Sequence, residues 1–128
     1  MTGQQPLRAD KAPQQDSEAL AERIASIASE RKAIGLVVVD LRGLVGYTDF
    51  FVVCSGNTER QTKAIHDAVY RELKDAAALL PRRSEGLSEA RWILLDYLDV
   101  VLHVFTPDAR EFYRLENLWG DAPKRVVE

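Results

Sequence analysis

The chain has 128 residues, of which 46% are hydrophobic, and a formal net charge of -3 at pH 7. This length and composition favour one compact domain. The acidic balance disfavours direct, sequence-specific binding to nucleic acid, because neutralising phosphates requires a basic surface. The sequence has neither a run of about 20 apolar residues nor an apolar leader, so we expect a soluble cytoplasmic protein with no membrane contact.

One folded domain is expected between two short tails. Residues 1–16 mix Gln, Pro and charges of both signs, which is typical of a disordered segment. Residues 17–123 contain all of the predicted helices and strands, and residues 124–128 are left as a C-terminal tail. No internal repeat or linker divides the domain.

The first half of the domain contains helix and strand signals in alternation. Apolar residues at helical spacing predict a helix near 17–33, with a capping residue at its start. Two apolar runs, 36–41 and 50–54, are typical of buried strands. A capping box that begins at Thr58 then opens a long amphipathic helix, which Pro81 ends.

Strands dominate the second half. A short strand is predicted over 83–86, followed by nearly contiguous strands over 91–97 and 99–106 that should form a tight antiparallel hairpin. A cap followed by Pro107 predicts a final helix through Leu118. The order α-β-β-α-β-β-β-α predicts an α/β fold, a single domain with a mixed sheet of about five strands flanked by helices. The second helix should connect its strands by a right-handed crossover.

The hairpin has two different faces. A two-residue turn at Tyr97-Leu98 would place Asp96 opposite Asp99 and fix which side chains share a face. One face is aliphatic and should lie under helices as core: Ile93, Leu95, Val100, Leu102 and Val104. The other mixes aromatic, aliphatic and charged residues, which is the composition of a binding surface. It comprises Trp92, Leu94, Asp96, Asp99, Val101, His103 and Phe105.

Asp96 and Asp99 need an explanation, because like charges directly opposite each other weaken a strand pair. They either form a solvated turn or accept Lys or Arg side chains from a basic partner. In the second case Trp92 and Leu94 supply the apolar anchor. Charge reversal at Asp96 should then abolish partner binding without unfolding the domain.

No catalytic, cofactor or metal site can be argued from the sequence. Ser55-Gly56 joins a strand to a helix N-terminus, and it forms either a turn with a cap or a site for an anion. An enzyme that used Ser55-Gly56 with Asp96 and Asp99 would lack the closely spaced carboxylates that hold a divalent metal. Asp96, Asp99 and His103 match no standard metal site.

The final helix is rich in aromatic residues. Phe112, Leu115 and Trp119 have helical spacing and should pack in the core, whereas Tyr113 falls off that stripe and should be exposed. Cys54 is the single cysteine, and its apolar surroundings predict a buried small side chain rather than a nucleophile.

Six segments form an ordered pattern along the chain. They are TDFFVVCSG at 48–56, RQ at 60–61, WILLDY at 92–97, DVVLHVF at 99–105, REFY at 110–113 and LWGDAP at 118–123. Together they resemble the ribosomal silencing factor, or Iojap, family. The resemblance covers nearly everything from the first helix to Pro123.

This resemblance implies a translational repressor that binds the large ribosomal subunit and sterically blocks joining of the small subunit, typically when nutrients are scarce. The implied contact is a ribosomal protein at the intersubunit face, and the acidic charge favours a basic one. Also implied are a fold related to nucleotidyltransferases without their chemistry, no cofactor, and a homodimer when the protein is free. Two alternatives stay open, a large-subunit assembly factor and a nucleotidyltransferase-like enzyme.

The family's partner contacts match here at several positions of the hairpin and the last helix. With the adjoining Leu94, the candidates are Trp92, Leu94, Asp96, Tyr97, Asp99, His103 and Tyr113. Two positions depart from the family pattern, because Phe50 stands where Tyr is common and Leu98 stands where the hairpin turn usually has Gly. Leu disfavours the positive φ of a tight turn, so the turn should be widened or strained.

Overall fold

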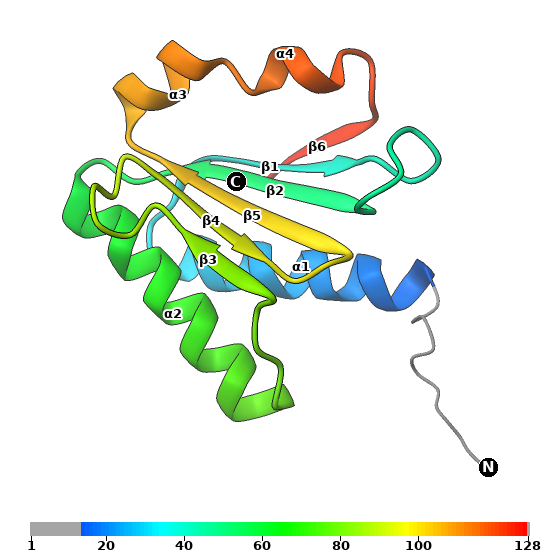
Figure 1. The fold of residues 1–128 in the computed structure, drawn as a ribbon, viewed down its shortest axis with the longest axis horizontal. Helices are drawn as coiled ribbons and strands as arrows, with labels where there is room; N and C mark the ends of the chain where they lie inside the picture. Colours follow the sequence, from blue (N-terminus) through cyan, green and yellow to red (C-terminus); the bar gives the residue numbers. More distant parts are fainter. Residues whose placement is uncertain (1–13, 128) are drawn as a thin grey trace.

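Helices and strands alternate along residues 14–127, the part of the chain that the computed structural model describes (Figure 1). The elements are α1 (Gln14–Glu30), β1 (Ile34–Asp40), β2 (Phe50–Ser55), α2 (Glu59–Ala77), β3 (Arg83–Glu85), β4 (Trp92–Asp96), β5 (Val100–Phe105), α3 (Pro107–Tyr113), α4 (Glu116–Trp119) and β6 (Lys124–Val127). The predicted α/β class is confirmed. The tail predicted over 1–16 lies outside the described residues except for 14–16, which begin α1. None of the described helices is both long and apolar enough to cross a membrane.

The strands form one mixed sheet in the order β3-β4-β5-β2-β1-β6. All neighbouring strands are antiparallel except β2 and β5, which run parallel near the centre. β3 therefore runs in the same direction as β2, with β4 and β5 between them. α2 connects β2 to β3 and provides the predicted crossover.

Helices cover both faces of the sheet (Figure 1). α1 and α2 lie on one face and contribute to the larger of two core clusters. α3 and α4 lie across the opposite face, over a smaller cluster: Val39, Leu41, Phe51, Val53, Val101, Phe105, Ala109, Leu115, Trp119 and Ala122. β2 is buried along its whole length because both faces are covered. Cys54 lies within it as predicted, and burial raises the pKa of its thiol to about 12.

α2 begins and ends where its sequence predicts. The Thr58 hydroxyl accepts a hydrogen bond from the Gln61 N–H at 3.1 Å, a cap that typically stabilises a helix by about 1 kcal/mol. The helix ends at Ala77, and the capping residue Ala78, three residues before Pro81, has the left-handed φ of 53° common after a last turn. Its buried residues face the sheet: Thr62, Ile65, His66, Ala68, Val69 and Leu73.

β6 adds a sixth strand where the sequence predicts about five. Its residues, Lys124–Val127, pair antiparallel with β1 in the segment left as a C-terminal tail. Four residues, two of them charged, give too short a signal to predict a strand without knowing the neighbour they pair with.

The last helix is divided in two, so the prediction of one continuous helix through Leu118 is wrong. Arg114 adopts a left-handed φ of 48° and ends α3. The break takes Phe112 out of the predicted core stripe, and its side chain is 75% exposed. Leu115 and Trp119 are buried, and Tyr113 is exposed, as predicted.

The hairpin register differs from the prediction by two residues. Asp96 lies opposite Val101 rather than Asp99. A shift of two residues preserves the alternation of side chains, so the two predicted faces are correct although the turn is not. The turn centres on Leu98, which has a φ of 78°, and the Asp99 N–H donates to the Tyr97 carbonyl at 3.0 Å. Leu98 therefore carries the strain that the sequence predicts.

Replacing Leu98 with glycine should raise the free energy of unfolding by about 1 kcal/mol. Glycine adopts a positive φ without the clash that costs other residues about 1–2 kcal/mol. Little apolar burial is lost, because the Leu98 side chain is half exposed. Urea denaturation measures the change, and Leu98→Ala is the matched control because it keeps the strained Cβ. A glycine variant less stable than the alanine variant would contradict the prediction.

Candidate protein-binding site

One face of the β4–β5 hairpin brings together most of the predicted partner contacts. We call it the hairpin face and define it by three cross-strand pairs, Trp92 with Phe105, Leu94 with His103, and Asp96 with Val101. It belongs to the side of the sheet over which α3 and α4 lie (Figure 1). Trp92 and Leu94 are only half-buried, so part of this face is accessible to a partner.

Aromatic rings join the hairpin face to the end of α3. The Trp92 ring centroid lies 5.0 Å from that of Phe105 and 4.8 Å from that of Tyr113. The indole N–H of Trp92 donates to Nδ1 of His103 at 3.1 Å. Trp92 is therefore held in place by neighbours while part of its surface remains open, as expected for an anchor residue.

His103 is an uncharged histidine at neutral pH. Its side chain is 4% exposed, and the Phe51 ring lies 4.5 Å away in an edge-on contact. Burial lowers the pKa of His103 to about 4, because removing water disfavours the charged ring more than the nearby Asp96 charge favours it. His103 therefore contributes a polar ring without charge.

Asp96 is paired within the chain rather than solvated. It is 3% exposed, and one oxygen contacts Arg82 Nη2 at 2.8 Å and Arg83 Nε at 3.3 Å. The other accepts the Leu98 N–H at 2.8 Å. Burial alone would raise the pKa of Asp96, but these hydrogen bonds and the two guanidinium charges outweigh it and lower the pKa below 3.8.

This environment corrects two expectations about Asp96. The solvated turn is wrong, because the carboxylate is buried. Charge reversal would place a third cation beside Arg82 and Arg83, so it should destabilise the fold and cannot test binding alone.

The remaining candidates divide between the two sides of the sheet. Tyr113 lies beside Trp92, and Asp99 lies in the turn, partly exposed. Tyr97 packs in the core under α1 and α2, where burial raises the pKa of its hydroxyl to about 12. Arg82 and Arg83 are contacts of Asp96 that the sequence reading missed. Two consecutive cations beside the short strand predicted over 83–86 were the available signal, but they do not indicate which carboxylate they contact.

A cavity of about 210 Å³ lies at one end of the hairpin face. Its walls come from β2, the β4–β5 hairpin, the segment before β2 and the start of β3. The lining residues are Tyr47, Phe51, Arg82, Arg83, Leu94, Asp96, Val101 and His103. Apolar side chains and charged groups therefore converge on one concave site, as is usual for binding sites.

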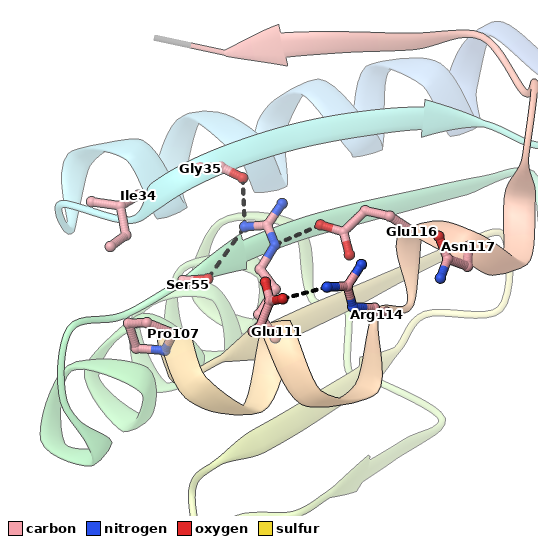
Figure 2. A pocket seen from close by; sticks show the side chains of 9 residues that line it. Ile34, Gly35, Ser55, Pro107, Glu111, Arg114, Glu116 and Asn117 are labelled. Atoms are coloured by element: carbon pink, nitrogen blue, oxygen red, sulfur yellow. Dashed lines mark hydrogen bonds and ion pairs between the residues drawn. The ribbon is translucent and has the colours of Figure 1, made fainter.

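A second cavity, of about 390 Å³, lies at the Ser55 end of β2 (Figure 2). Arg110 crosses it and donates through Nη1 to the Gly35 carbonyl at 2.8 Å and to the Ser55 hydroxyl at 3.2 Å. Its Nε donates to Glu116 at 2.8 Å. Arg114 is likewise paired with Glu111, so the cations that an anion would need are already neutralised.

The residues of the nucleotide-binding alternative lie apart. Ser55 ends β2, whereas Asp96 lies in the row of Phe51, four residues back along that strand. At about 3.3 Å per residue this separates the two rows by about 13 Å. Among residues 14–127, no three His, Cys, Asp or Glu side chains are grouped to hold a metal ion.

Comparison with known proteins identifies the family. A family model described as ribosomal silencing factor during starvation matches residues 14–128. The chain belongs to the ribosomal silencing factor family. A family member from Bacillus subtilis, named ribosomal silencing factor RsfS, is 41% identical over 102 residues, which are 77% of this chain and 83% of that protein.

Two further proteins are similar to this chain, one by its solved structure and one by its sequence. A crystal structure of a protein from Chromobacterium violaceum has a TM-score of 0.75 and 29% identity, covering 91% of this chain and 94% of that one. A protein from Mus musculus, named mitochondrial assembly of ribosomal large subunit protein 1, is 31% identical over 101 residues. These are 77% of this chain and 44% of that protein. The residues matched by the family model include the whole hairpin face.

Replacing Asp96 with asparagine should lower the free energy of unfolding by about 2 kcal/mol at pH 7, because charge-assisted hydrogen bonds are lost. A lowered carboxyl pKa stabilises the fold above the unfolded value of about 3.9, and this contribution is lost as pH falls through the folded pKa. The difference from wild type should therefore shrink below about pH 4. Urea denaturation at pH 7 and pH 3 measures it. Asp121→Asn, at an exposed position, should change stability by less than about 0.5 kcal/mol, and an Asp96→Asn deficit as large at pH 3 as at pH 7 would contradict the assignment.

Proposed function

We propose that this protein represses translation by binding the large ribosomal subunit and blocking the small subunit from joining it. Membership of the ribosomal silencing factor family carries the proposal. The contact we propose is the hairpin face with Tyr113, docked on a basic ribosomal protein at the intersubunit face. Nutrient limitation is the condition under which we expect this repression.

The composition of the hairpin face supports a protein as the direct partner. Trp92 and Leu94 are half-buried and Tyr113 is 46% exposed, which leaves an aromatic and aliphatic surface open to solvent. Such partly open aromatic residues often contribute most of the binding energy of an interface. The net charge of -3 favours a basic partner at long range and disfavours bare RNA.

Steric exclusion explains how binding alone could repress translation. A domain of this length has a radius of gyration of about 14 Å. Two ribosomal surfaces that contact each other directly cannot close around such an object. This mechanism makes and breaks no covalent bond, so we propose a binding protein that uses no cofactor and no catalytic residue.

A role in assembly of the large subunit is the second candidate. The name of the relative from Mus musculus supports it. The same surface could serve both roles, since each requires contact with the large subunit. The homodimer expected for the free protein, and its cytoplasmic location, stay predictions.

Sedimentation with purified subunits tests the main proposal. We expect the protein to be recovered with isolated large subunits and not with small subunits, and preloaded large subunits to fail to join small ones in a light-scattering assay. Recovery with small subunits alone, or with neither, would contradict the proposal. Binding to immature large particles but not to mature ones would instead favour the assembly role.

Replacing Leu94 with alanine should weaken binding to large subunits about tenfold, which corresponds to about 1.4 kcal/mol. The lost side chain removes apolar area from the centre of the proposed interface. Val126→Ala is the matched control, since Val126 is 65% exposed on β6 at the other edge of the sheet. Equal losses in the two variants, measured by sedimentation and checked for folding by urea denaturation, would contradict the assigned surface.

A further inference from the structure

His103 presents a buried hydrogen-bond donor that residues 14–127 leave without an acceptor. The Trp92 indole can only donate, so the Nδ1 atom that it contacts must be the unprotonated nitrogen. Because burial keeps the ring neutral at pH 7, its single proton is on Nε2. Nε2 is buried and has no hydrogen-bond partner within the described chain. Such a group costs about 1–3 kcal/mol unless a ligand or partner satisfies it.

The sheet register gives the direction of this N–H. Trp92 and His103 lie in neighbouring rows of the hairpin face, and Asp96 and Val101 form the next row on the other side of His103. Nδ1 faces the Trp92 row, so Nε2 faces away from it, toward the row of Asp96 and Val101. These two residues line the cavity of about 210 Å³ together with His103. The unsatisfied donor therefore lies on the cavity side of the ring but beneath the cavity surface, since Nε2 itself is buried.

The rest of the cavity combines apolar walls with two guanidinium groups. Phe51, Leu94 and Val101 supply the apolar surface. Arg82 and Arg83 also line it, and more than half of each arginine side chain is exposed. A group that enters from solvent can therefore reach the guanidinium groups directly, and it reaches the His103 N–H when the side chains that cover Nε2 move aside.

The charges that line the cavity leave an excess of positive charge. Asp96 is the one carboxylate among the lining residues, and its oxygens already accept from Leu98, Arg82 and Arg83. The Arg82 side chain contacts the Asp96 carboxylate through Nη2 alone, one nitrogen of a guanidinium that has five N–H donors. Glu85 contacts Arg83 at 3.5 Å from outside the cavity, and because both side chains are more than half exposed, water screens this pair and it offsets the Arg83 charge only weakly.

We propose that this cavity receives an aspartate or glutamate side chain of the protein partner. The carboxylate accepts a hydrogen bond from Arg82 and, once the side chains that cover Nε2 move aside, the Nε2–H of His103, while the apolar walls exclude water. A neutral acceptor would satisfy His103 and leave the positive excess uncompensated, whereas a carboxylate satisfies both and forms stronger, charge-assisted hydrogen bonds. This inference rests on the proposed function, because it specifies the partner chemistry of the same surface.

Acetate tests the cavity without ribosomes. In full-length protein with ¹⁵N-labelled histidine, we expect sodium acetate to shift the Nε2 and Hε2 resonances of His103 saturably. Sodium chloride at the same ionic strength should not, and Arg82→Gln should weaken the acetate effect. No saturable shift, or an equal shift in chloride, would overturn the proposed carboxylate site.

A pair of amide variants tests the same site in the complex. Gln at position 103 can place an amide N–H near the Nε2 position, whereas Asn can accept from Trp92 but does not reach that position. We expect His103→Asn and Arg82→Gln to bind large subunits at least tenfold more weakly than wild type, and His103→Gln to stay within about threefold. Urea denaturation verifies that each variant is folded.

The possible outcomes separate this inference from the proposed function. Wild type that fails to bind large subunits while acetate still shifts His103 would refute the proposed function and leave the carboxylate site supported. If wild type, His103→Asn and Arg82→Gln all bind large subunits equally tightly, the inference is overturned and the proposed function stands. Weak binding by His103→Asn with unchanged binding by Arg82→Gln would indicate a neutral acceptor, which also overturns the carboxylate.

Discussion

The parallel pairing of β2 with β5 fixes both the core and the candidate site. The two strands are paired from Phe50 with Val100 to Ser55 with Phe105, and every residue of both is buried. Helices on both faces make this possible, because a parallel pair has no face suited to water. The same register places Phe51 beside Val101. Both residues line the cavity and also belong to the smaller core cluster, so one pair of side chains serves the cavity and the core.

Polar groups on the hairpin face are positioned by segments outside the helices. Asp96 is held by Arg82 and Arg83, and His103 is held by Trp92. A buried charge or polar atom costs free energy unless it is paired, so these contacts restrict each side chain to one arrangement. The Asp96 carboxylate and Nδ1 of His103 are therefore held in place before any partner arrives, which reduces the entropy lost on binding.

The sequence predicted those features that depend on local pattern. α2 was predicted from its cap and apolar stripe. The two hairpin faces were predicted correctly despite a two-residue error in register, because side chains alternate with a period of two. Features that depend on distant residues were not predictable. The burial of Asp96 depends on Arg82, 14 residues away, and becomes evident only once β3 is paired with β4. The break at Arg114 likewise has no glycine or proline to signal it.

The acidic net charge and the arginine-rimmed cavity act over different distances. At physiological salt, charges beyond about 8 Å are largely screened, so the net charge influences the approach of a basic partner more than the final contact. Within the contact, the affinity depends on the groups that line the cavity. These groups are hydrogen-bond donors rather than acceptors, because the Asp96 carboxylate is already paired. A basic protein with an acidic side chain at the point of contact is complementary at both distances. A uniformly basic patch would be attracted to the chain as a whole and repelled by Arg82 and Arg83 at the cavity.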